Sequence, residues 1–415
     1  MNNLSFVDIF AGASGLAEGF ISAGYLPVAH VEVDKYACLT IKTRSAYHYC
    51  KRKNLLDHYY EYYTDKISRD EFYKKIPFNE LESIIQKEIN EKNFDSIIKI
   101  IENSQERLGE KSVDVLLGGP PCQAYSLIGR KVNESKKKSD ERIYYYRLYI
   151  KFLKKLKPKI FVFENVPGLL SFENGFVFDD LKESLKKAGY SFDYRILNAA
   201  DFGVLQNRRR IIIIGWEKEL NLGYPVFEKA VNKYKVNDLF KDLPFLESGN
   251  NLGLFSYNKK ASKYVFQSGI RNGFGEVNQN ITRPINHTDR QIYKTAIKLW
   301  NKNKQRLKYT DLPEKLRTHN NHTSFLDRFK VVAGEESAAH TLIAHIAKDG
   351  HYFIHPDINQ CRSISVREAA RIQSFPDDFY FEGPRTAIFT QIGNAVPPQM
   401  AFRLAEKIKY QLKNV

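Results

Sequence analysis

The stretch LSFVDIFAGASGLAEGFISAGY, residues 4–25, predicts a buried strand, a glycine-rich turn and a helix in direct succession. Its apolar run is interrupted by Gly12 and Gly15, after which apolar residues recur at helical spacing. LPVAHVEVD (26–34) then predicts a second strand that ends in acidic residues, and KYACLTIKTR (35–44) begins another helix. A strand–helix–strand opening of this kind is typical of the nucleotide-binding half of a doubly wound α/β sheet.

Further apolar runs predict the remainder of that sheet. They are short and bounded by turn residues, as expected of buried strands: VDVLLGG (113–119), KIFVFENVPG (159–168) and RRRIIIIGW (208–216). Residues 51 to about 110 differ, because they are charged, rich in tyrosine and patterned at helical spacing, as in FNELESIIQKEI (78–89). We therefore expect them to form helices inserted before the strand at 113–119.

The character of the chain changes after about residue 222. Up to about residue 361 it is rich in loops, with scattered glycine, asparagine and histidine and little sustained periodicity. Residues 362–415 again predict helices, one of them ending near Pro376. We expect a first domain at 1–221, a smaller loop-rich domain at 222–361, and a return segment at 362–415 that completes the first domain.

The charge composition of the chain indicates which kinds of molecule it could bind. Among 415 residues, 64 are Lys or Arg and 48 are Asp or Glu, a formal net charge of +16, which suits a polyanion such as nucleic acid. An ordinary lysine-rich surface would give the same number. No apolar run approaches the ~20 residues of a membrane span, and the N-terminal residues lack the pattern of a signal peptide.

The segment LLGGPPCQAYS (116–126) contains the most distinctive cysteine of the chain. Two prolines directly before Cys122 restrict the backbone, at the carboxyl end of a predicted strand, where open α/β sheets bind ligands. The other cysteines (Cys38, Cys50 and Cys361) show no paired or finger-like spacing, which argues against a disulfide framework or a zinc site and is consistent with a reducing compartment. The sequence predicts a reactive thiol at 122.

Charged residues at other strand ends add to this candidate site. Glu32 lies about twenty residues after the glycine turn, where a carboxylate can bind ribose hydroxyls, although an exposed strand-end acid would look the same. Glu164 ends the apolar run of FENV and is either a catalytic acid or a buried salt-bridge partner. Arg208 and Arg210 lie two apart, which predicts one face of a strand and a shared role in binding a polar substrate edge, or else a solvated basic cluster.

Taken together, these motifs resemble one family, the cytosine-C5 DNA methyltransferases. The resemblance covers residues 6 to 402, and its motifs occur in the order that the family shows: FAGASG, VEVD, GGPPCQAYS, FENV, DFGVLQNRRRIIIIG, SISVREAARIQSFPDDF and QIGNAVP. Two positions depart from the family pattern. Ser14 stands where the family has the first glycine of a pair, and Leu205 stands where a proline is usual before the glutamine.

The resemblance implies a fold, a cofactor and roles for residues. The fold would be the mostly parallel sheet of S-adenosylmethionine-dependent methyltransferases, with residues 222–361 as a target-recognition domain. S-adenosylmethionine would be bound by Phe10, Gly12, Gly15, Glu32, Gly119, Pro121 and Asn394, with Asp95 as the acid near its adenine. The catalytic residues would be Cys122 as nucleophile with Glu164, Arg208 and Arg210, and no metal would be needed. Contacts to DNA would come from Gln123, Ser126, Arg130, Lys131 and Gln206.

The reaction implied is methylation of C5 of a cytosine flipped out of duplex DNA. Three other readings compete with it. A protein that only binds DNA would have no use for the intact set of Cys122, Glu164, Arg208 and Arg210. RNA-directed relatives carry a Cys-Phe-Thr element in the variable region, and no cysteine occurs here between 123 and 360. A dinucleotide oxidoreductase has no use for the Pro-Cys-Gln corner.

The resemblance also implies a biological setting. We expect a monomeric cytoplasmic bacterial enzyme of a restriction–modification system, acting at a short specific site. The histidines of HTLIAHIAKDGHYFIHPD (340–357) are irregularly spaced and have no cysteine ligand nearby, so no metal site is predicted there.

Overall fold

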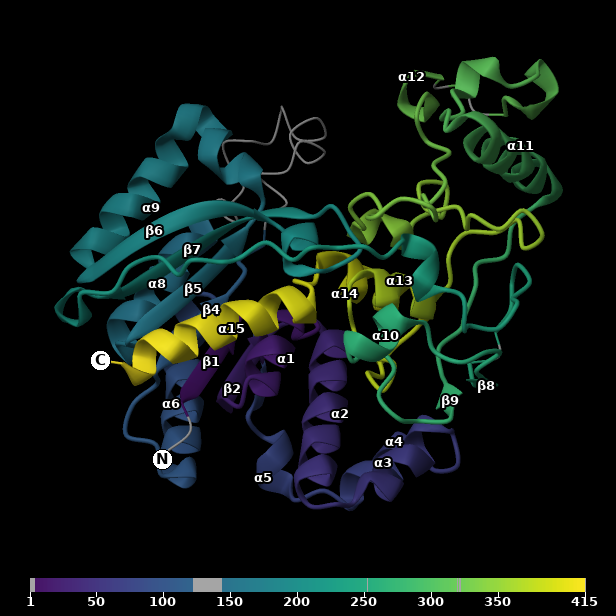
Figure 1. Cartoon of the computed structure of the whole chain (residues 1–415). Coiled ribbons are helices and arrows are strands. Elements are labelled where there is room, and N and C mark those ends of the chain that lie inside the picture. Colours follow the sequence, from purple (N-terminus) through teal and green to yellow (C-terminus); the bar gives the residue numbers. More distant parts are fainter. Residues whose placement is uncertain (1–3, 122–143, 252, 319, 321, 415) are drawn as a thin grey trace.

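The computed structural model describes residues 4–121, 144–251, 253–318, 320 and 322–414 (Figure 1). A seven-stranded sheet with the order β3-β2-β1-β4-β5-β7-β6 forms its centre. Neighbouring strands from β3 to β5 run parallel, whereas β7 is antiparallel to both β5 and β6. The predicted mostly parallel α/β fold is therefore confirmed. The strands are β1 (Ser5–Ile9), β2 (Leu26–Glu32), β3 (Ile84–Gln86), β4 (Val115–Gly118), β5 (Ile160–Asn165), β6 (Tyr190–Asn198) and β7 (Arg209–Glu217).

The central strands form because their residues are apolar on both faces. Every residue of β1, β4 and β5 is buried, and β7 contains four consecutive isoleucines, all of them buried. Strands covered by helices on both sides have this continuous apolar character, in contrast to the alternation of a strand with one wet face. The polar residues that follow these strands are consequently collected at one edge of the sheet.

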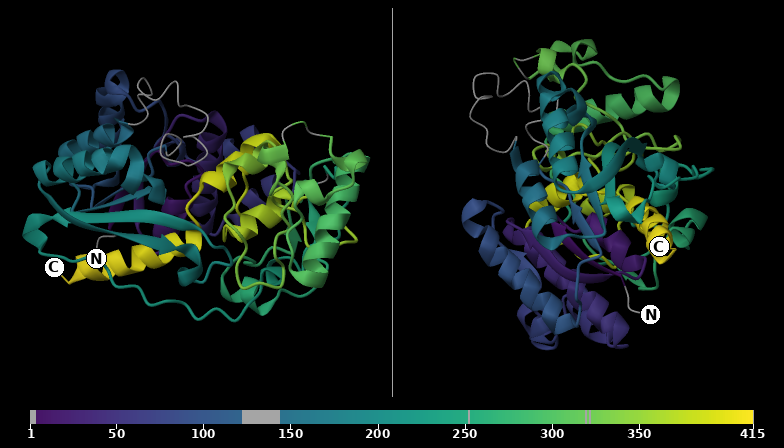
Figure 2. Two further views of the ribbon diagram at one scale, coloured as in Figure 1. Left: turned by 90° about the horizontal axis from the view of Figure 1, so that it is seen from above. Right: turned by 90° about the vertical axis from the view of Figure 1, so that its left-hand side faces the viewer.

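Helices cover both faces of the sheet (Figures 1 and 2). One face packs on α6 (Glu91–Leu108), α8 (Tyr145–Leu156) and α9 (Phe176–Lys187), whose apolar side chains share one core with β1, β2 and β5. The opposite face packs on α1 (Gly15–Ser22) and α15 (Pro398–Lys413). The C-terminal helix thus returns to the first helix of the chain and completes the sheet domain.

The region 51–110 contains a strand that the sequence pattern did not predict. It begins after α2 (Lys35–Arg52) and contains α3 (Leu56–Tyr63), α4 (Arg69–Lys74) and α5 (Phe78–Leu81) before β3 and α6. The expectation of helices throughout was therefore wrong for residues 84–86. Ile84 and Ile85 pair with the edge of β2 and are buried there, so a partner distant in sequence decides the conformation of this short β-branched run.

The loop-rich region also contains more regular structure than expected. It holds α10 (Lys263–Gln267), α11 (His287–Asn303), α12 (His322–Phe325) and a two-stranded ribbon of β8 (Phe255–Ser256) and β9 (Glu276–Val277). Asn286 caps α11 by accepting a hydrogen bond from Asp289 N, and four buried apolar side chains of the helix face a core of their own. In Figure 1, α11 and α12 form a lobe that stands beside the sheet domain.

The predicted boundary at residue 361 falls within a shared core. One apolar cluster joins residues of the loop-rich region, such as Leu239 and Val265, to α13 (Val366–Ile372) and α14 (Arg385–Asn394). The return segment consequently packs against both parts of the molecule before α15 reaches the sheet. The division at 222–361 stays a prediction.

Candidate active site

A cavity of about 540 Å³ opens at the carboxyl ends of the parallel strands. It is the place where an open α/β sheet binds ligands, because the loops after β1, β2, β4 and β5 meet there. The cavity brings together residues that lie as far apart in the sequence as the start of α1 and the end of α14 (Arg385–Asn394). Those predicted from the sequence that line it are Phe10, Gly12, Gly15, Glu32, Gly119, Pro121, Glu164, Arg210 and Asn394.

The turn after β1 forms one wall of the cavity. Phe10, Gly12 and Ser14 all have positive φ (56°, 55° and 62°), so the backbone coils tightly before α1 begins at Gly15. Glu32 holds this turn, because its Oε2 accepts a hydrogen bond of 2.7 Å from the backbone N–H of Gly12. Its Oε1 accepts 2.8 Å hydrogen bonds from Val33 N and Asp34 N.

The Glu32 carboxyl is half-buried beside this turn. Burial raises its pKa, although the three backbone N–H groups act in the opposite direction. A carboxylate fixed in this way, next to a glycine turn, has the chemistry that binds vicinal hydroxyls such as those of a ribose. Glu32 thus lines the cavity and holds its glycine turn, and its role in binding a nucleoside stays a prediction.

Glu164 and Arg210 form the opposite wall. Arg210 Nε lies 2.8 Å from Glu164 Oε1, and both side chains are only about one-eighth exposed. They meet because β5 and β7 are neighbours in the sheet, with Glu164 in register with Ile212. A Cβ at position 119 would come within 2.9 Å of Glu164 Oε2, so the carboxylate needs a glycine on the neighbouring strand end.

The loop that leads to residue 122 is attached to this wall. Asn165 Nδ2 donates a 3.0 Å hydrogen bond to the backbone oxygen of Pro120. The asparagine of the FENV motif thus connects the end of β5 to the two prolines, a role that the sequence analysis did not assign to it. Cys122 itself, with Gln123, Ser126, Arg130 and Lys131, lies outside the described residues.

The three other cysteines are buried and unpaired thiols. Burial raises the pKa of Cys38 to about 12 and that of Cys50 to about 11, and it raises the pKa of Cys361 as well. Thiols with such pKa values are poor nucleophiles near neutral pH, because the thiolate is the reactive form. Cys122 is consequently the one candidate nucleophile left among the four cysteines.

Arg208 does not share the face and role that the spacing predicted. It precedes β7, lies outside the lining of the cavity, and is fully buried. Its guanidinium donates to the backbone oxygen of Leu342 at 2.6 Å and to that of Gly393 at 3.1 Å. The prediction failed because Arg208 lies where the entrance of β7, the loop around Leu342 and the end of α14 meet. Its guanidinium donates to backbone carbonyl groups of the latter two segments.

Gln206 likewise differs from its predicted role in contacting DNA. Its side chain is buried and its amide is fully engaged within the protein. Nε2 donates to Gln373 Oε1 at 2.9 Å and to Ile372 O, and Oε1 accepts from Leu342 N at 2.8 Å. These bonds join the entrance of β7 to the loop-rich region and α13, which is a structural role.

The predicted position of the adenine-contacting acid is also corrected. Asp95 is exposed on α6 and does not line the cavity, whereas Lys87, Glu88 and Ile89, directly after β3, do. Glu88 is thus the acid that the third strand end contributes. Glu88 was missed because the strand before it, Ile84–Gln86, was interpreted as part of a helix.

Beyond this cavity, the described residues give little sign of other cofactors. They contain no group of three or more His, Cys, Asp or Glu side chains arranged to hold a metal ion. None of the helices in the described ranges has the length and apolar character needed to cross a bilayer.

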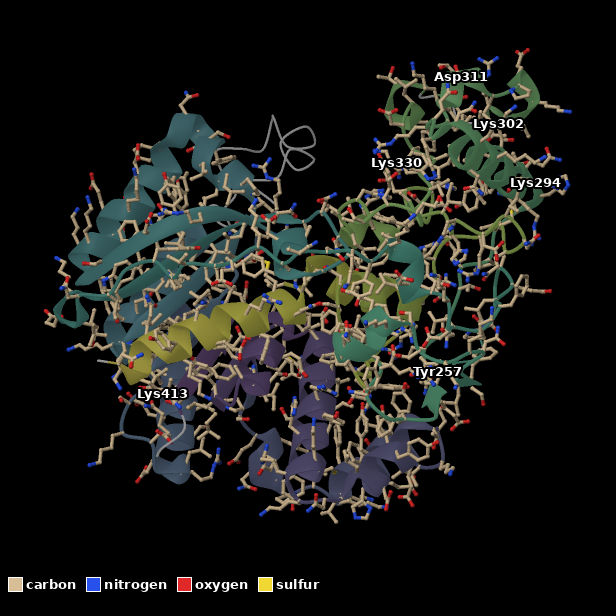
Figure 3. All side chains as sticks on the ribbon, viewed as in Figure 1. Tyr257, Lys294, Lys302, Asp311, Lys330 and Lys413 are labelled. Atoms are coloured by element: carbon tan, nitrogen blue, oxygen red, sulfur yellow. The ribbon has the colours of Figure 1, made fainter. Side chains whose placement is uncertain are left out.

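In Figure 3, Lys330 lies on the side of the α11–α12 lobe that is nearer to the sheet domain. Lys294 and Lys302, both on α11, lie farther out.

Comparison with known proteins finds a matching family and several similar chains. A family described as C-5 cytosine-specific DNA methylase matches residues 70–410. Type II methyltransferase M.Bpa9945I of Bacillus paralicheniformis is 41% identical, over 97% of this chain and 98% of that protein. Type II methyltransferase M1.HphI of Haemophilus parahaemolyticus is 27% identical, over 98% of this chain and 87% of that protein.

The fold has solved counterparts. The crystal structure of a protein described as a DNA modification methyltransferase (E. coli) superimposes with a TM-score of 0.66, covering 99% of this chain and all of that one. Sequence identity between the two chains is 20%.

Proposed function

The chain belongs to the C-5 cytosine-specific DNA methylases, and we propose that its cavity brings S-adenosylmethionine together with a cytosine flipped out of duplex DNA. This proposal rests mainly on the observation that one cavity has two chemically distinct walls. The glycine turn with Glu32 suits a nucleoside, and the Glu164–Arg210 pair suits the polar edge of a base. A methyl donor and its acceptor need such adjacent subsites.

The residues present fit S-adenosylmethionine as the donor. Glu32 would bind the ribose, and it shares the cavity lining with Glu88, after the neighbouring strand, and with Asn394, the last residue of α14. When bound, S-adenosylmethionine supplies an electrophilic methyl group carried on a sulfonium. The protein's own part is to fix the donor against the sheet edge and to activate the acceptor.

Activation of the acceptor requires a nucleophile, because C5 of cytosine is a poor one. We assign this role to Cys122, which follows directly on Pro121 at the cavity. Addition of its thiolate to C6 makes C5 enamine-like, C5 then takes the methyl group, and loss of the C5 proton expels the thiolate. One difficult step is thereby divided into easier ones.

Glu164 and Arg210 stabilise charge during this addition. We assign to the Glu164 carboxylate the hydrogen bonds from the exocyclic amine of the base and from N3–H, once N3 gains a proton during the addition. Arg210 holds that carboxylate at 2.8 Å. Positive charge favours a thiolate, and Arg210 on the cavity wall is a cation that could supply it. Because both side chains are mostly buried, their orientation is set before the base arrives.

The proposal extends to the substrate and its setting. The base must leave the duplex, at a cost of a few kcal/mol for unstacking and unpairing. We propose that residues 222–361 recognise a short site in double-stranded DNA and that the basic residues after Cys122 contact phosphates. By analogy with the type II relatives, the enzyme would protect host DNA in a cytoplasmic restriction–modification system, acting as a monomer.

The first experiment tests the reaction and its nucleophile. Plasmid DNA from bacteria expressing the protein is sequenced after bisulfite treatment, and we expect unconverted cytosines at one short recurring site. Cys122→Ser should abolish methylation while retaining binding to DNA that contains the site. DNA with 5-fluorocytosine at the site should trap the wild-type protein covalently in the presence of donor, and Cys122→Ser should not be trapped. Normal methylation by that variant would remove Cys122 from the mechanism.

A further inference from the structure

A buried acid on the wall of the cavity has no part in the mechanism above. Asp8, the fourth residue of β1, is 2% exposed and lines the cavity. Its register partner on β2 is His30, 1% exposed, and His30 Nδ1 lies 3.6 Å from Asp8 Oδ2. An acid and a histidine on adjacent strands are thus buried together next to the glycine turn after β1.

Ser14 connects this pair to the turn. Its Oγ lies 3.4 Å from the same Nδ1 of His30. Ser14 is the N-cap residue of α1, yet its side chain makes no capping hydrogen bond, and its φ of 62° is a conformation that favours glycine. The serine hydroxyl is therefore directed to the histidine instead of the helix, at a position where a glycine would be less strained.

Polar atoms in this group lack hydrogen bonds. Among the described residues, Asp8 Oδ2 and His30 Nε2 are both buried without a hydrogen-bond partner. Burial raises the pKa of Asp8, with His30 acting in the opposite direction. An uncompensated buried carboxyl is costly, and a positive charge brought close to it would stabilise its ionised form.

We propose that Asp8, positioned by His30 and Ser14, is the counter-charge for the sulfonium of the methyl donor. This inference rests on the proposed function and adds to it a basis for selectivity. S-adenosylmethionine differs from its product, S-adenosylhomocysteine, only in the transferred methyl group and in the sulfonium charge that comes with it. With the sulfur bound beside Asp8, this carboxylate would distinguish donor from product and weaken product retention after each turnover.

The experiment compares the two ligands on one protein. Dissociation constants for S-adenosylmethionine and S-adenosylhomocysteine are measured by calorimetry for the wild type and for Asp8→Asn. We expect Asp8→Asn to weaken donor binding about tenfold, which is the scale of one charge-assisted contact, and to change product binding less than twofold. A matched control is Asp34→Asn, which removes an exposed negative charge at the cavity but keeps the N-cap of α2.

The positioning part has its own variant, Ser14→Gly. It relieves the positive φ and removes the hydroxyl, so thermal stability should stay unchanged or rise, while the ratio of the two dissociation constants falls about threefold. This variant keeps the test decisive if Asp8→Asn fails to fold.

The outcomes separate this inference from the proposed function. Equal loss of both ligands in Asp8→Asn, or an unchanged ratio in both variants, would overturn the role of Asp8. If Asp34→Asn lowered the ratio of the two dissociation constants as much as Asp8→Asn does, any nearby negative charge would have the same effect. That result would also overturn the specific role of Asp8. If the wild type bound neither ligand, the proposed function itself would fail.

Discussion

Two arginines separated by a single residue illustrate how position decides a side chain's role. Arg210 lies on β7 beside the cavity and pairs with Glu164, whereas Arg208 is enclosed where the loop-rich region and α14 meet the strand. Both are cations with the same reach. Their surroundings alone place Arg210 in the candidate site and give Arg208 a structural role in joining distant segments.

These roles predict opposite phenotypes for the same substitution. Arg208→Met leaves the carbonyl groups of Leu342 and Gly393 without their donor, so we expect a loss of about 3 kcal/mol in unfolding free energy. Arg210→Met should cost less than about 1 kcal/mol in stability but lower kcat about 100-fold, because Glu164 loses its orientation. Denaturant unfolding and steady-state kinetics on both variants measure this. The reverse pattern would contradict the assignment of Arg208.

At the level of elements, the start of α13 is the clearest case of local chemistry and tertiary contact combined. Ser365 and Glu368 form a capping box: Ser365 Oγ accepts from Glu368 N, and Glu368 accepts from Ser365 N. The same glutamate binds Arg362 through both oxygens at 2.7 Å. The helix begins where it does because the cap and the ion pair share one carboxylate.

Removal of the cap should therefore have a measurable effect. We expect Ser365→Ala to lower the unfolding free energy by about 1–2 kcal/mol, since one buried helix N–H loses its acceptor. Ser68 caps α4 with the same box on an exposed surface, so Ser68→Ala is the matched control and should cost less. Urea unfolding midpoints of the two variants test this, and an equal or larger loss for Ser68→Ala would count against the argument.

The whole molecule is joined by buried ion pairs between distant segments. Arg44 of α2 pairs with Glu18 of α1 and Asp378, and Arg371 of α13 pairs with Asp242 and Asp377. His355 is a buried histidine beside Glu368, and burial lowers its pKa to about 4. Burial acts to raise the pKa of Glu368, but the Arg362 guanidinium outweighs it and lowers that pKa to about 2.

These shifts predict a protein that loses stability on acidification in two stages. His355 stays neutral in the fold while the unfolded chain protonates near pH 6.5, so its contribution is lost between about pH 6.5 and 4. Glu368 has a depressed pKa, so its contribution is present above pH 4.5 and is lost below it. Unfolding free energies between pH 7 and 4.5 should fall, and His355→Gln should reduce that fall by about 2 kcal/mol. An unchanged pH profile in the variant would show that His355 is not the group responsible.

Much of the fold could be predicted from periodicity, and some of it could not. The strands at 5–9, 115–118, 160–165 and 209–217 were expected because fully buried strands are apolar throughout. β3 was missed, since three residues carry no period of their own and only the edge of β2 makes them a strand. The helix α11 was missed although Asn286 and the apolar residues after it formed a readable signal.

The sequence by itself determined the family, which strands end in polar residues, and most of the residues at the cavity. Those properties are local: a glycine turn, a carboxylate after a strand and a proline corner have their chemistry whatever lies around them. The tertiary structure alone decided which of Arg208 and Arg210 faces the cavity, that Glu88 and not Asp95 lines it, and that Ser14, His30 and Asp8 meet. These depend on which distant segments converge at a point, and no local pattern encodes that convergence.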